Sequence, residues 1–376
     1  MEPNQLSDPI WVATSAALEK MVFHLNAQPS IAVDTESNSL FAYQEQVCLI
    51  QFSTPDTDYL VDPLALKDLS ILAPIFADAK IEKIFHAAEY DLICLRRDFH
   101  FTFANLFDTM QAARILGRDG VGLGSLLEAE FGLQLDKRYQ RANWGIRPLP
   151  PAQLAYARLD THYLFALRER MEAALVEAGR MELAKEDFLR LCRPVENNNS
   201  GERENSWHIS GSKELTPQQM AILHELCTYR DDQARSANLP PFKIMSNQAL
   251  VEIAELEPRL MEELYNLQNL HPRQIQRHGA QLLKVVARGL EATPLRRRHT
   301  PRPDDAILAR LEALRIWRRD TGKKLGVESD IILPRDAMFN LAEANPRSMD
   351  DIRAVMGDLP YRAEQFGDKI LHALHI

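Results

Sequence analysis

Short runs of β-type residues fill the first third of the chain, and helical periodicity dominates the remainder. The strand-like segments are IAVDTES, VCLIQFS, DYLVD and KIEKIFH. Helical spacing follows in AEYDLICLRRDF, DTMQAARIL and PAQLAYARLDTHYLFALRERMEAAL. Because the spacers between the first three strands are short, antiparallel hairpins are favoured there. The pattern predicts a mixed α/β layer domain whose sheet is flanked by helices.

Two segments without periodicity divide the chain. Residues 194–212 are rich in Asn, Ser and Gly, and residues 292–303 combine prolines with a cluster of arginines. Both compositions are typical of linkers. We therefore expect an α/β domain at 1–193 and two small all-α domains at 213–291 and 304–376.

The two small domains are related by a shift of 88 positions without a gap. The shift superposes identical residues, including Leu223 with Leu311, Arg230 with Arg318, Asp232 with Asp320, Pro258 with Pro346 and Gly279 with Gly367. These pairs keep the same relation to neighbouring apolar residues, which indicates a duplicated domain of several amphipathic helices.

The composition places the chain among ordinary globular proteins. Charged residues make up 26% and the net charge is -9, with the acidic excess confined to the first 200 residues. No apolar run reaches the length of a membrane-crossing helix, and no signal-peptide pattern opens the sequence. The four cysteines form no CxxC pair, which argues against a zinc site or a disulfide framework. We expect a cytoplasmic protein without a membrane partner.

Candidate chemistry begins with Asp34 and Glu36 in the segment IAVDTES. Side chains two residues apart on a strand share a face, so these carboxylates lie together. A solvated strand face would explain such a pair equally well when it is taken alone. Apolar Ile31 and Val33 mark a core strand instead, where like charges repel unless a cation is supplied.

Three further residues extend this acidic set. Asp91 lies where a strand gives way to a helix, with Glu89 as the rival acid and a helix cap as the simpler interpretation. Tyr156 and Asp160 are four residues apart on a periodic helix and therefore share a face, although a packed tyrosine beside a surface acid has the same spacing. Together the four acids suit hard divalent cations, which prefer oxygen ligands.

The segments DTE, HAAEYDL and YARLD resemble the three exonuclease motifs of the DEDD superfamily, and GLGSLLEAEFGLQLDKRYQRANWGIRPL is similar to ribonuclease D. The repeats resemble the helicase-and-ribonuclease-D C-terminal (HRDC) domain. The resemblance implies an RNase-H-like exonuclease domain that shortens RNA from its 3′ end and releases nucleoside 5′-monophosphates, with transfer-RNA precursors among the substrates. Alternatives are a DNA exonuclease and a catalytically silent RNA-binding scaffold; no obligate protein partner is indicated.

When the family's roles are carried over motif by motif, the resemblance implies that Asp34, Glu36, Asp91 and Asp160 bind two Mg²⁺ or Mn²⁺ ions. It implies that Tyr156 orients the nucleophile. Our hypothesis is that Asp34 bridges both ions, that Glu36 and Asp160 bind the first, and that Asp91 acts on the second through water. Two departures from the family are recorded: Asn143 precedes Trp144 where an aspartate is frequent, and the loop SNSLFAYQEQ lacks an arginine and paired tyrosines.

Basic residues supply candidate contacts to nucleic acid. The stretch before the catalytic helix interleaves cations with aromatic residues, a mixture that suits phosphate contacts and base stacking, and a solvated surface would show the same mixture. His86 follows an apolar run and either approaches the substrate or serves as a structural histidine. The candidate contacts are His86, Lys137, Arg138, Arg141, Arg147, Arg318 and Lys323. The basic residues of the tail suit RNA-backbone contacts or a protein docking surface.

Overall fold

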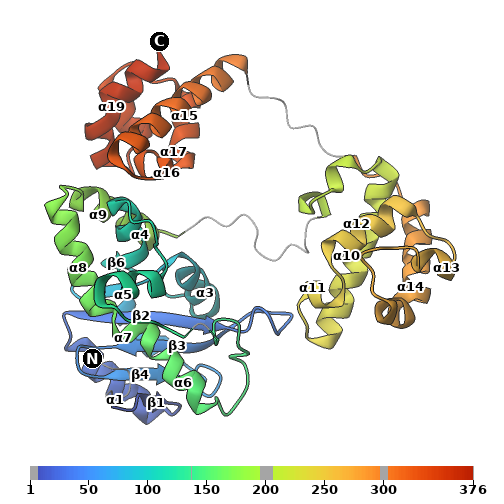
Figure 1. The fold of residues 1–376 in the computed structure, drawn as a ribbon, viewed down its shortest axis with the longest axis horizontal. Coiled ribbons are helices and arrows are strands. Elements are labelled where there is room, and N and C mark those ends of the chain that lie inside the picture. The colour runs from blue at the N-terminus through green and yellow to red at the C-terminus, as the bar shows by residue number, and fades with distance from the viewer. Residues whose placement is uncertain (1–6, 137, 195–205, 297–303, 376) are drawn as a thin grey trace. The chain divides into compact units, whose positions relative to one another are not determined.

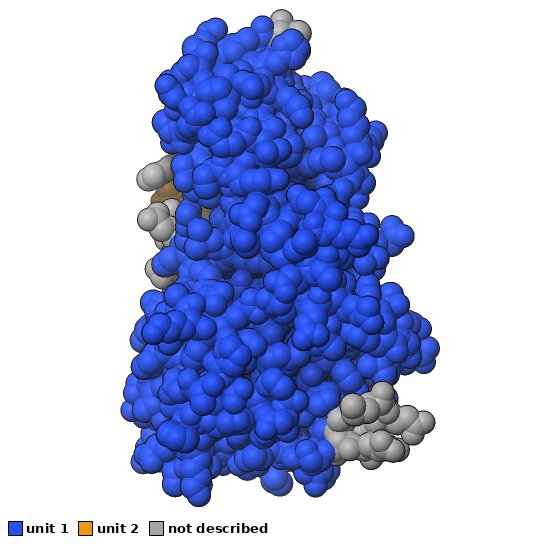
Figure 2. Space-filling view, turned by 90° about the vertical axis from the view of Figure 1, so that its left-hand side faces the viewer, with its two compact units in different colours: residues 1–37, 47–194, 302–376 blue, residues 38–46, 195–301 orange. Residues whose placement is uncertain are grey.

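The computed structural model describes residues 7–136, 138–194, 206–296 and 304–375 (Figure 1). These residues form two compact units, which Figure 2 distinguishes by colour. The first comprises the described residues of the ranges 1–37, 47–194 and 302–376, and the second comprises those of 38–46 and 195–301. In the described part of the chain, no helix combines the length and apolarity that crossing a bilayer requires.

A six-stranded mixed sheet organises the α/β domain, in the order β1-β4-β3-β2-β5-β6. The antiparallel β2–β3 and β3–β4 hairpins are those predicted from the short spacers, whereas the other neighbours are parallel. The predicted fold class is therefore confirmed. Short edge strands β1 and β6 were not predicted. The strands are β1 (Ile10–Val12), β2 (Ser30–Ser37), β3 (Val47–Ser53), β4 (Asp58–Val61), β5 (Glu82–Phe85) and β6 (Leu106–Asp108).

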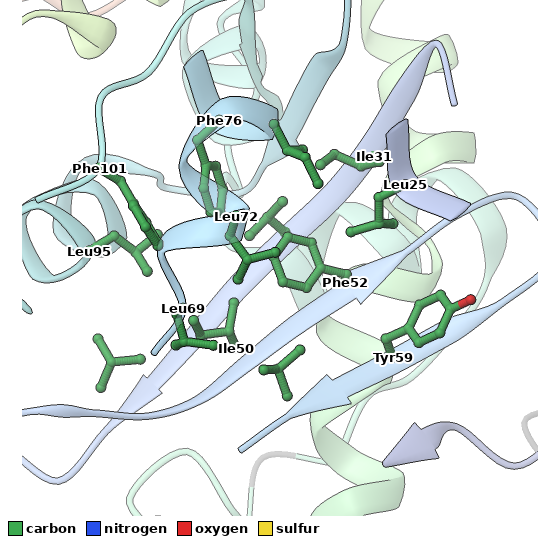
Figure 3. Packing of buried hydrophobic residues seen from close by; sticks show 14 of the residues in the cluster. Leu25, Ile31, Ile50, Phe52, Tyr59, Leu69, Leu72, Phe76, Leu95 and Phe101 are labelled. Carbon is green, nitrogen blue, oxygen red and sulfur yellow. The ribbon is translucent and has the colours of Figure 1, made fainter. Parts of the chain in front are cut away.

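Helices cover both faces of this sheet because consecutive buried residues of β2 and β3 point alternately to its two sides. Figure 3 shows one face, where Ile31 and Phe52 pack against Leu25, Leu72 and Phe76. The helical elements of this domain are α1 (Ser15–Asn26), η2 (Ser70–Leu72), α2 (Ala73–Ala77), α3 (Glu89–Phe99), α4 (Thr109–Leu116), α5 (Leu123–Phe131), α6 (Pro151–Ala157), α7 (Leu159–His162), α8 (Leu164–Glu177) and α9 (Met181–Cys192).

The opposite face holds Ala32, Ile84 and Phe107, which pack against α4, α5, α8 and α9. The short helix α7 also lies against β2 and β3. Since Asp34 and Glu36 alternate with Val33 and Thr35, they project from the same side of β2 as Ala32. Strand periodicity thus directs the two acids towards α7.

One predicted helix is not continuous. The run from Pro151 to Leu175 was expected as a single helix, and the structure interrupts it at Arg158 and Tyr163. The hydroxyl of Thr161 donates to the carbonyl of Arg158 at 3.3 Å, and the Thr161 amide makes a 3.4 Å contact with the same oxygen. Such local bonds compete with the regular i to i−4 ladder, so the prediction of one uninterrupted helix was wrong.

The two helical domains show the 88-residue register in their packing. Adding a Cβ to Gly279 would bring it within 2.8 Å of Met261, and the equivalent Gly367 would meet Met349. The first domain consists of η3 (Ser206–His208), η4 (Ser212–Glu214), α10 (Pro217–Ala237), α11 (Pro241–Ile244), α12 (Asn247–Leu256), α13 (Met261–Leu264) and α14 (Pro272–Glu291). The second consists of α15 (Asp305–Leu325), α16 (Ser329–Ile332), α17 (Arg335–Ala344), α18 (Met349–Val355) and α19 (Pro360–Leu374).

The second helical domain and the α/β domain share the first unit, and a buried ion cluster joins them. Arg362 of α19 pairs with Glu186 and Asp187 of α9, and all three side chains are buried. The Glu186 carboxylate also accepts from the backbone amides of Tyr361 at 2.8 Å and Arg362 at 3.3 Å. Glu186 therefore caps the N-terminus of α19 from a different domain.

In the second unit, the loop of residues 38–46 packs with the first helical domain. The Tyr43 hydroxyl donates to Asp231 at 2.7 Å, and the Tyr43 amide donates to the side chain of Asn238 at 3.2 Å. The ammonium of Lys243 lies 4.3 Å from the centre of the Phe41 ring. This loop connects β2 to β3, so it follows directly after the strand that carries Asp34 and Glu36.

Candidate metal centre and nuclease site

Three acids from two elements converge. Asp34 and Glu36 of β2 and Asp160 of α7 each offer a carboxylate oxygen, and these oxygens all lie within 4.8 Å of one another. The alternation of β2 places the first two on one face, and the packing of α7 against that face brings the third. The structure thus brings together residues that are more than one hundred positions apart.

Burial and mutual repulsion raise the proton affinity of this cluster. Desolvation, together with the charges of Asp34, Asp160 and Asp91, raises the pKa of Glu36 to about 10. Burial, opposed by a hydrogen bond from Tyr156, raises the pKa of Asp160 to about 7. The pKa of Asp34 also lies well above its ordinary value because of burial and the proximity of Asp160. A divalent cation would reverse this effect, since it favours the ionised form of each ligand.

The donor set fits such a cation. Three carboxylates with mutually close oxygens form the hard-oxygen ligand set that Mg²⁺ and Mn²⁺ prefer. Gln51 lies opposite Asp34 in the β2–β3 register, is fully buried, and has a side-chain amide without a hydrogen-bond partner among the described residues. Since directly paired residues of neighbouring strands share a face, the polar environment extends from Asp34 onto β3.

The fourth acid, Asp91, lies in the first turn of α3 and is buried. The Thr35 hydroxyl donates to its carboxylate, which ties α3 to the middle of the acidic strand. Burial and the charge of Asp34 raise the pKa of Asp91. Asp91 is not one of the three acids with mutually close oxygens, but its charge acts on both Asp34 and Glu36.

Tyr156 lies on α6 and its hydroxyl donates to Asp160, so the predicted proximity of the two side chains holds across the break in the helix. The rings of Tyr139 and Trp144 lie 5.8 Å and 6.2 Å from the Tyr156 ring, centre to centre. Burial and the neighbouring carboxylates raise the pKa of Tyr156 above its ordinary value. The phenol therefore stays protonated and acts as a hydrogen-bond donor.

A cleft of about 350 Å³ opens onto these side chains. Asp34, Glu36, Asp160 and Tyr156 line it, and so do His86, Asp136, Gln140 and the start of α5 at residues 122–125. The sequence analysis assigned no role to Asp136, Gln140 or residues 122–125. Residues 122–125 (GLGS) nevertheless lie within the stretch that resembles ribonuclease D. The Nδ1 of His86 lies 2.9 Å from the Thr109 hydroxyl, and burial lowers the pKa of His86 to about 4, so the ring is neutral.

Comparison with known proteins agrees with this geometry. Residues 9–175 match the 3′-5′ exonuclease family, and residues 219–286 and 307–374 each match the HRDC domain. Ribonuclease D of Pseudomonas paraeruginosa is 28% identical, and the alignment covers 97% of each chain. Residues 9–175 therefore form a domain of the 3′-5′ exonuclease family, and the whole chain is similar to ribonuclease D. This family implies divalent metal ions, with which the acidic cluster is compatible.

Other relatives of the chain are longer. The exosome complex exonuclease RRP6 of Saccharomyces cerevisiae is 32% identical over 95% of this chain but only 52% of its own length. The chain spans about a third to a half of the first three curated relatives that it matches. Among solved structures, the RRP6 catalytic core of Trypanosoma brucei matches with a TM-score of 0.63 at 27% identity, over 77% of this chain and 82% of that one. Escherichia coli RNase D, at 23% identity, shares the fold over 98% and 99% of the two chains, with a TM-score of 0.67.

Two arginines expected to contact nucleic acid make structural bonds within the protein. The Arg147 guanidinium makes a bidentate pair with Asp62, at 2.6 and 2.7 Å, and also donates to the carbonyls of Cys48, Trp144 and Ile146. Arg318 donates to the Leu333 carbonyl at 2.9 Å. Its duplicate, Arg230, makes the equivalent bond to Met245 at 3.0 Å, as expected for a structural arginine. Both side chains are only partly buried, and their contacts to RNA stay predictions.

The remaining basic candidates stay predictions. Arg138 is exposed and pairs with Asp136, which itself lines the cleft. Arg141 is exposed, and Lys323 is exposed beside a separate cavity of about 450 Å³. Lys137 lies outside the described residues.

Proposed function

We propose that this exonuclease removes nucleotides from the 3′ ends of RNA in the cytoplasm, with transfer-RNA precursors among its substrates, and that its cleft holds two Mg²⁺ or Mn²⁺ ions. The observation that carries the proposal is the convergence of Asp34, Glu36 and Asp160 beside Tyr156 in one cleft. The preference for RNA is supported by relatives that are named ribonuclease D and exosome exonuclease.

The acids of the cleft would hold the metal ions. Asp34, Glu36 and Asp160 would supply the close carboxylate oxygens, and Asp91 would act from the side of α3. When bound, such ions polarise the scissile phosphate, lower the pKa of a water molecule and neutralise the leaving 3′ oxygen. Because the four carboxylates repel one another, they are all ionised only when cations are bound.

Tyr156 has a positioning task. Its protonated hydroxyl donates to Asp160, which fixes one carboxylate oxygen and leaves the phenol oxygen able to accept from a water molecule in the cleft. Because its pKa is raised above 10, the Tyr156 phenol is protonated at neutral pH and cannot take a proton from water. Tyr156 therefore orients the attacking water, and the proton leaves through other groups of the site.

The proposal is tested with a 3′-tailed single-stranded RNA and a DNA strand of the same sequence. The wild-type protein is expected to shorten the RNA stepwise to nucleoside 5′-monophosphates with Mg²⁺ or Mn²⁺ and to lose this activity in EDTA. Asp34→Asn and Asp160→Asn should each lower kcat by on the order of 10³-fold or more while the far-ultraviolet circular dichroism is unchanged.

The control is Asp330→Asn, which removes an exposed carboxylate of the second helical domain. Near-normal turnover by either cleft variant, or activity that persists without metal, would contradict the proposed site. Faster shortening of the DNA strand would identify a DNA exonuclease, and binding without cleavage would identify a silent scaffold.

A further inference from the structure

The helix that carries Asp160 is too short to hold its own position. α7 spans only Leu159–His162, so a single turn of backbone hydrogen bonds supports it. Interruptions of the helix at Arg158 and Tyr163 separate it from α6 and α8. A single isolated turn is intrinsically unstable. The geometry of the Asp160 carboxylate therefore depends on side-chain contacts that fix α7 to the sheet.

A buried polar cluster beneath α7 supplies these contacts. At its centre is Asp58, the first residue of β4, which accepts a hydrogen bond of 2.6 Å from the Ser53 hydroxyl of β3. The Ser53 hydroxyl lies 2.7 Å from the Thr161 hydroxyl. The Asp58 carboxylate also lies 3.0 Å from Nδ1 of His162 and 3.5 Å from Nε of Arg158.

These partners surround Asp160 in the sequence. Arg158 precedes it, and Thr161 and His162 follow it, so one carboxylate on β4 restrains the turn on both sides of the metal-ligand candidate. Ser53, Asp58, Thr161 and Arg158 are all at least nine-tenths buried. Because bulk water does not compete at such a position, each bond restrains the backbone more strongly than a surface contact would.

Asp58 itself is not part of the reacting site. Neither it nor Ser53 lines the cleft, and neither belongs to the close acidic set of the described residues. The two sets of contacts are thus separate. Asp160 lies close to Asp34 and Glu36, whereas the residues that flank Asp160 contact Asp58.

We propose that Asp58, acting through Ser53, Thr161, His162 and Arg158, is a positioning residue that sets the Asp160 carboxylate for metal binding. The inference rests on the proposed function, because it needs Asp160 to be a metal ligand. Residues that orient metal ligands from behind typically change metal affinity or activity by about 10- to 100-fold when they are replaced. A purely structural cluster would lower stability and leave metal affinity unchanged.

The test measures Mn²⁺ binding to the full chain by isothermal titration, together with kcat and KM on the 3′-tailed RNA. Asp58→Asn keeps the shape of the side chain and removes its charge, while Ser53→Ala and Thr161→Val delete single hydroxyls with little change in volume. We expect weaker Mn²⁺ binding by about 10- to 100-fold for Asp58→Asn and by a smaller factor for the hydroxyl deletions. Turnover should fall with it, and KM for RNA should stay within about twofold.

Two controls separate positioning from stability. Thr161→Ser keeps the hydroxyl and should restore Mn²⁺ affinity that Thr161→Val loses. Glu186→Gln disrupts a comparably buried ion pair of the same unit away from the cleft, and should lower the thermal midpoint while Mn²⁺ affinity stays at the wild-type value.

The outcomes are distinct. Wild-type Mn²⁺ affinity in Ser53→Ala, Thr161→Val and Asp58→Asn would overturn the positioning role. Wild-type protein that binds Mn²⁺ but leaves RNA intact would overturn the proposed function alone, because the positioning role is measured by affinity. Wild-type protein that binds no Mn²⁺ would overturn both.

Discussion

Asp34, Glu36 and Asp160 each hold a proton more tightly than the same group would in an unfolded chain. For Glu36 and Asp160, desolvation is the largest cause, and nearby carboxylates add to it. Folding without metal therefore opposes ionisation at the residues that would have to be ionised to bind a cation. Two measurable consequences follow, one for metal binding and one for stability.

The first consequence is a pH dependence of metal affinity. Because the pKa of Asp160 is raised to about 7 and that of Glu36 to about 10, a cation has to displace protons at neutral pH. Mn²⁺ affinity should therefore rise steadily from pH 6 to pH 9, with proton release that isothermal titration detects in buffers of different ionisation enthalpy. Affinity that is independent of pH over this range would show that the acids are already ionised.

The second consequence concerns the stability of the metal-free protein. A carboxyl group whose folded pKa is raised binds more protons in the folded state, so the stability it contributes is complete below its unfolded pKa and is lost as pH rises. Asp34 is such a group, since burial raises its pKa from 3.8. Asp34→Asn should therefore raise the thermal midpoint in EDTA at pH 8 by roughly 2 °C or more, and should leave it almost unchanged near pH 4.

The matched variant is Asp330→Asn, which alters an exposed acid that pairs with Arg114. Such surface pairs contribute little, so the midpoint should stay nearly unchanged at both pH values. A lower midpoint for Asp34→Asn in EDTA at pH 8 would mean that the Asp34 carboxylate stabilises the fold rather than opposing it.

Periodicity and the motif resemblance together predicted which acids meet, but neither could predict what the basic residues do. Asp34 and Glu36 share a face by alternation along a core strand, and Asp160 was added by the resemblance of its motif. Arg147 and Arg318 have the same local composition as RNA-binding arginines, yet their guanidinium groups bond to Asp62 and Leu333. Those partners lie far along the chain, and spacing carries no information about them.

Among the elements, the two helical domains keep one packing scheme but differ at the start of their last long helix. Helix α14 is capped locally, because His271 and Gln274 form a reciprocal capping pair. The residue of the second copy that corresponds to Gln274 is Arg362, and α19 has no side-chain cap of its own. Glu186 of α9 takes that place. The duplication therefore produced one helix that is capped internally and one that is completed by the α/β domain.

This difference predicts a stability change. Arg362→Gln introduces the residue of the first copy and leaves Glu186 and Asp187 buried without their cation. Breaking one side of a buried pair typically costs about 3 kcal/mol or more, so the urea midpoint of the full chain should fall clearly. Arg353→Gln, which removes an exposed pair with Glu364, should leave it unchanged. Equal midpoints for the two variants would show that the buried cluster does not stabilise the first unit.

The break within the predicted catalytic helix shows the limit of helical periodicity. Residues 151–175 contain no glycine, and their only proline lies at the first position, so nothing local indicates an interruption. The interruption depends on Thr161 and Arg158, whose partners include Ser53 and Asp58 on the sheet. A tertiary polar cluster outweighed a regular helical pattern, and it did so at the turn that carries Asp160.

For the whole molecule, the net charge of -9 favours the binding of cations and disfavours the approach of a polyanion. An acidic cleft repels a polyanion, so a nucleic-acid strand approaches it only when cations neutralise the carboxylates or when basic residues hold the phosphates nearby. The domain order was accessible from the sequence because composition changes abruptly at the linkers. The assignment of residues 38–46 to the second unit was not, since these residues lie between two strands of the first.

The loop of residues 38–46 has a practical consequence for protein engineering. Tyr43 is held by Asp231 and Asn238, so the tip of the β2–β3 hairpin depends on side chains that belong to the first helical domain. A chimaera that exchanges this domain for a homologous one must carry those two residues along. Without them, the turn that begins two residues after Glu36 loses its hydrogen bonds to the helical domain. An exchange of that domain would then also disturb the end of the strand that carries Asp34 and Glu36.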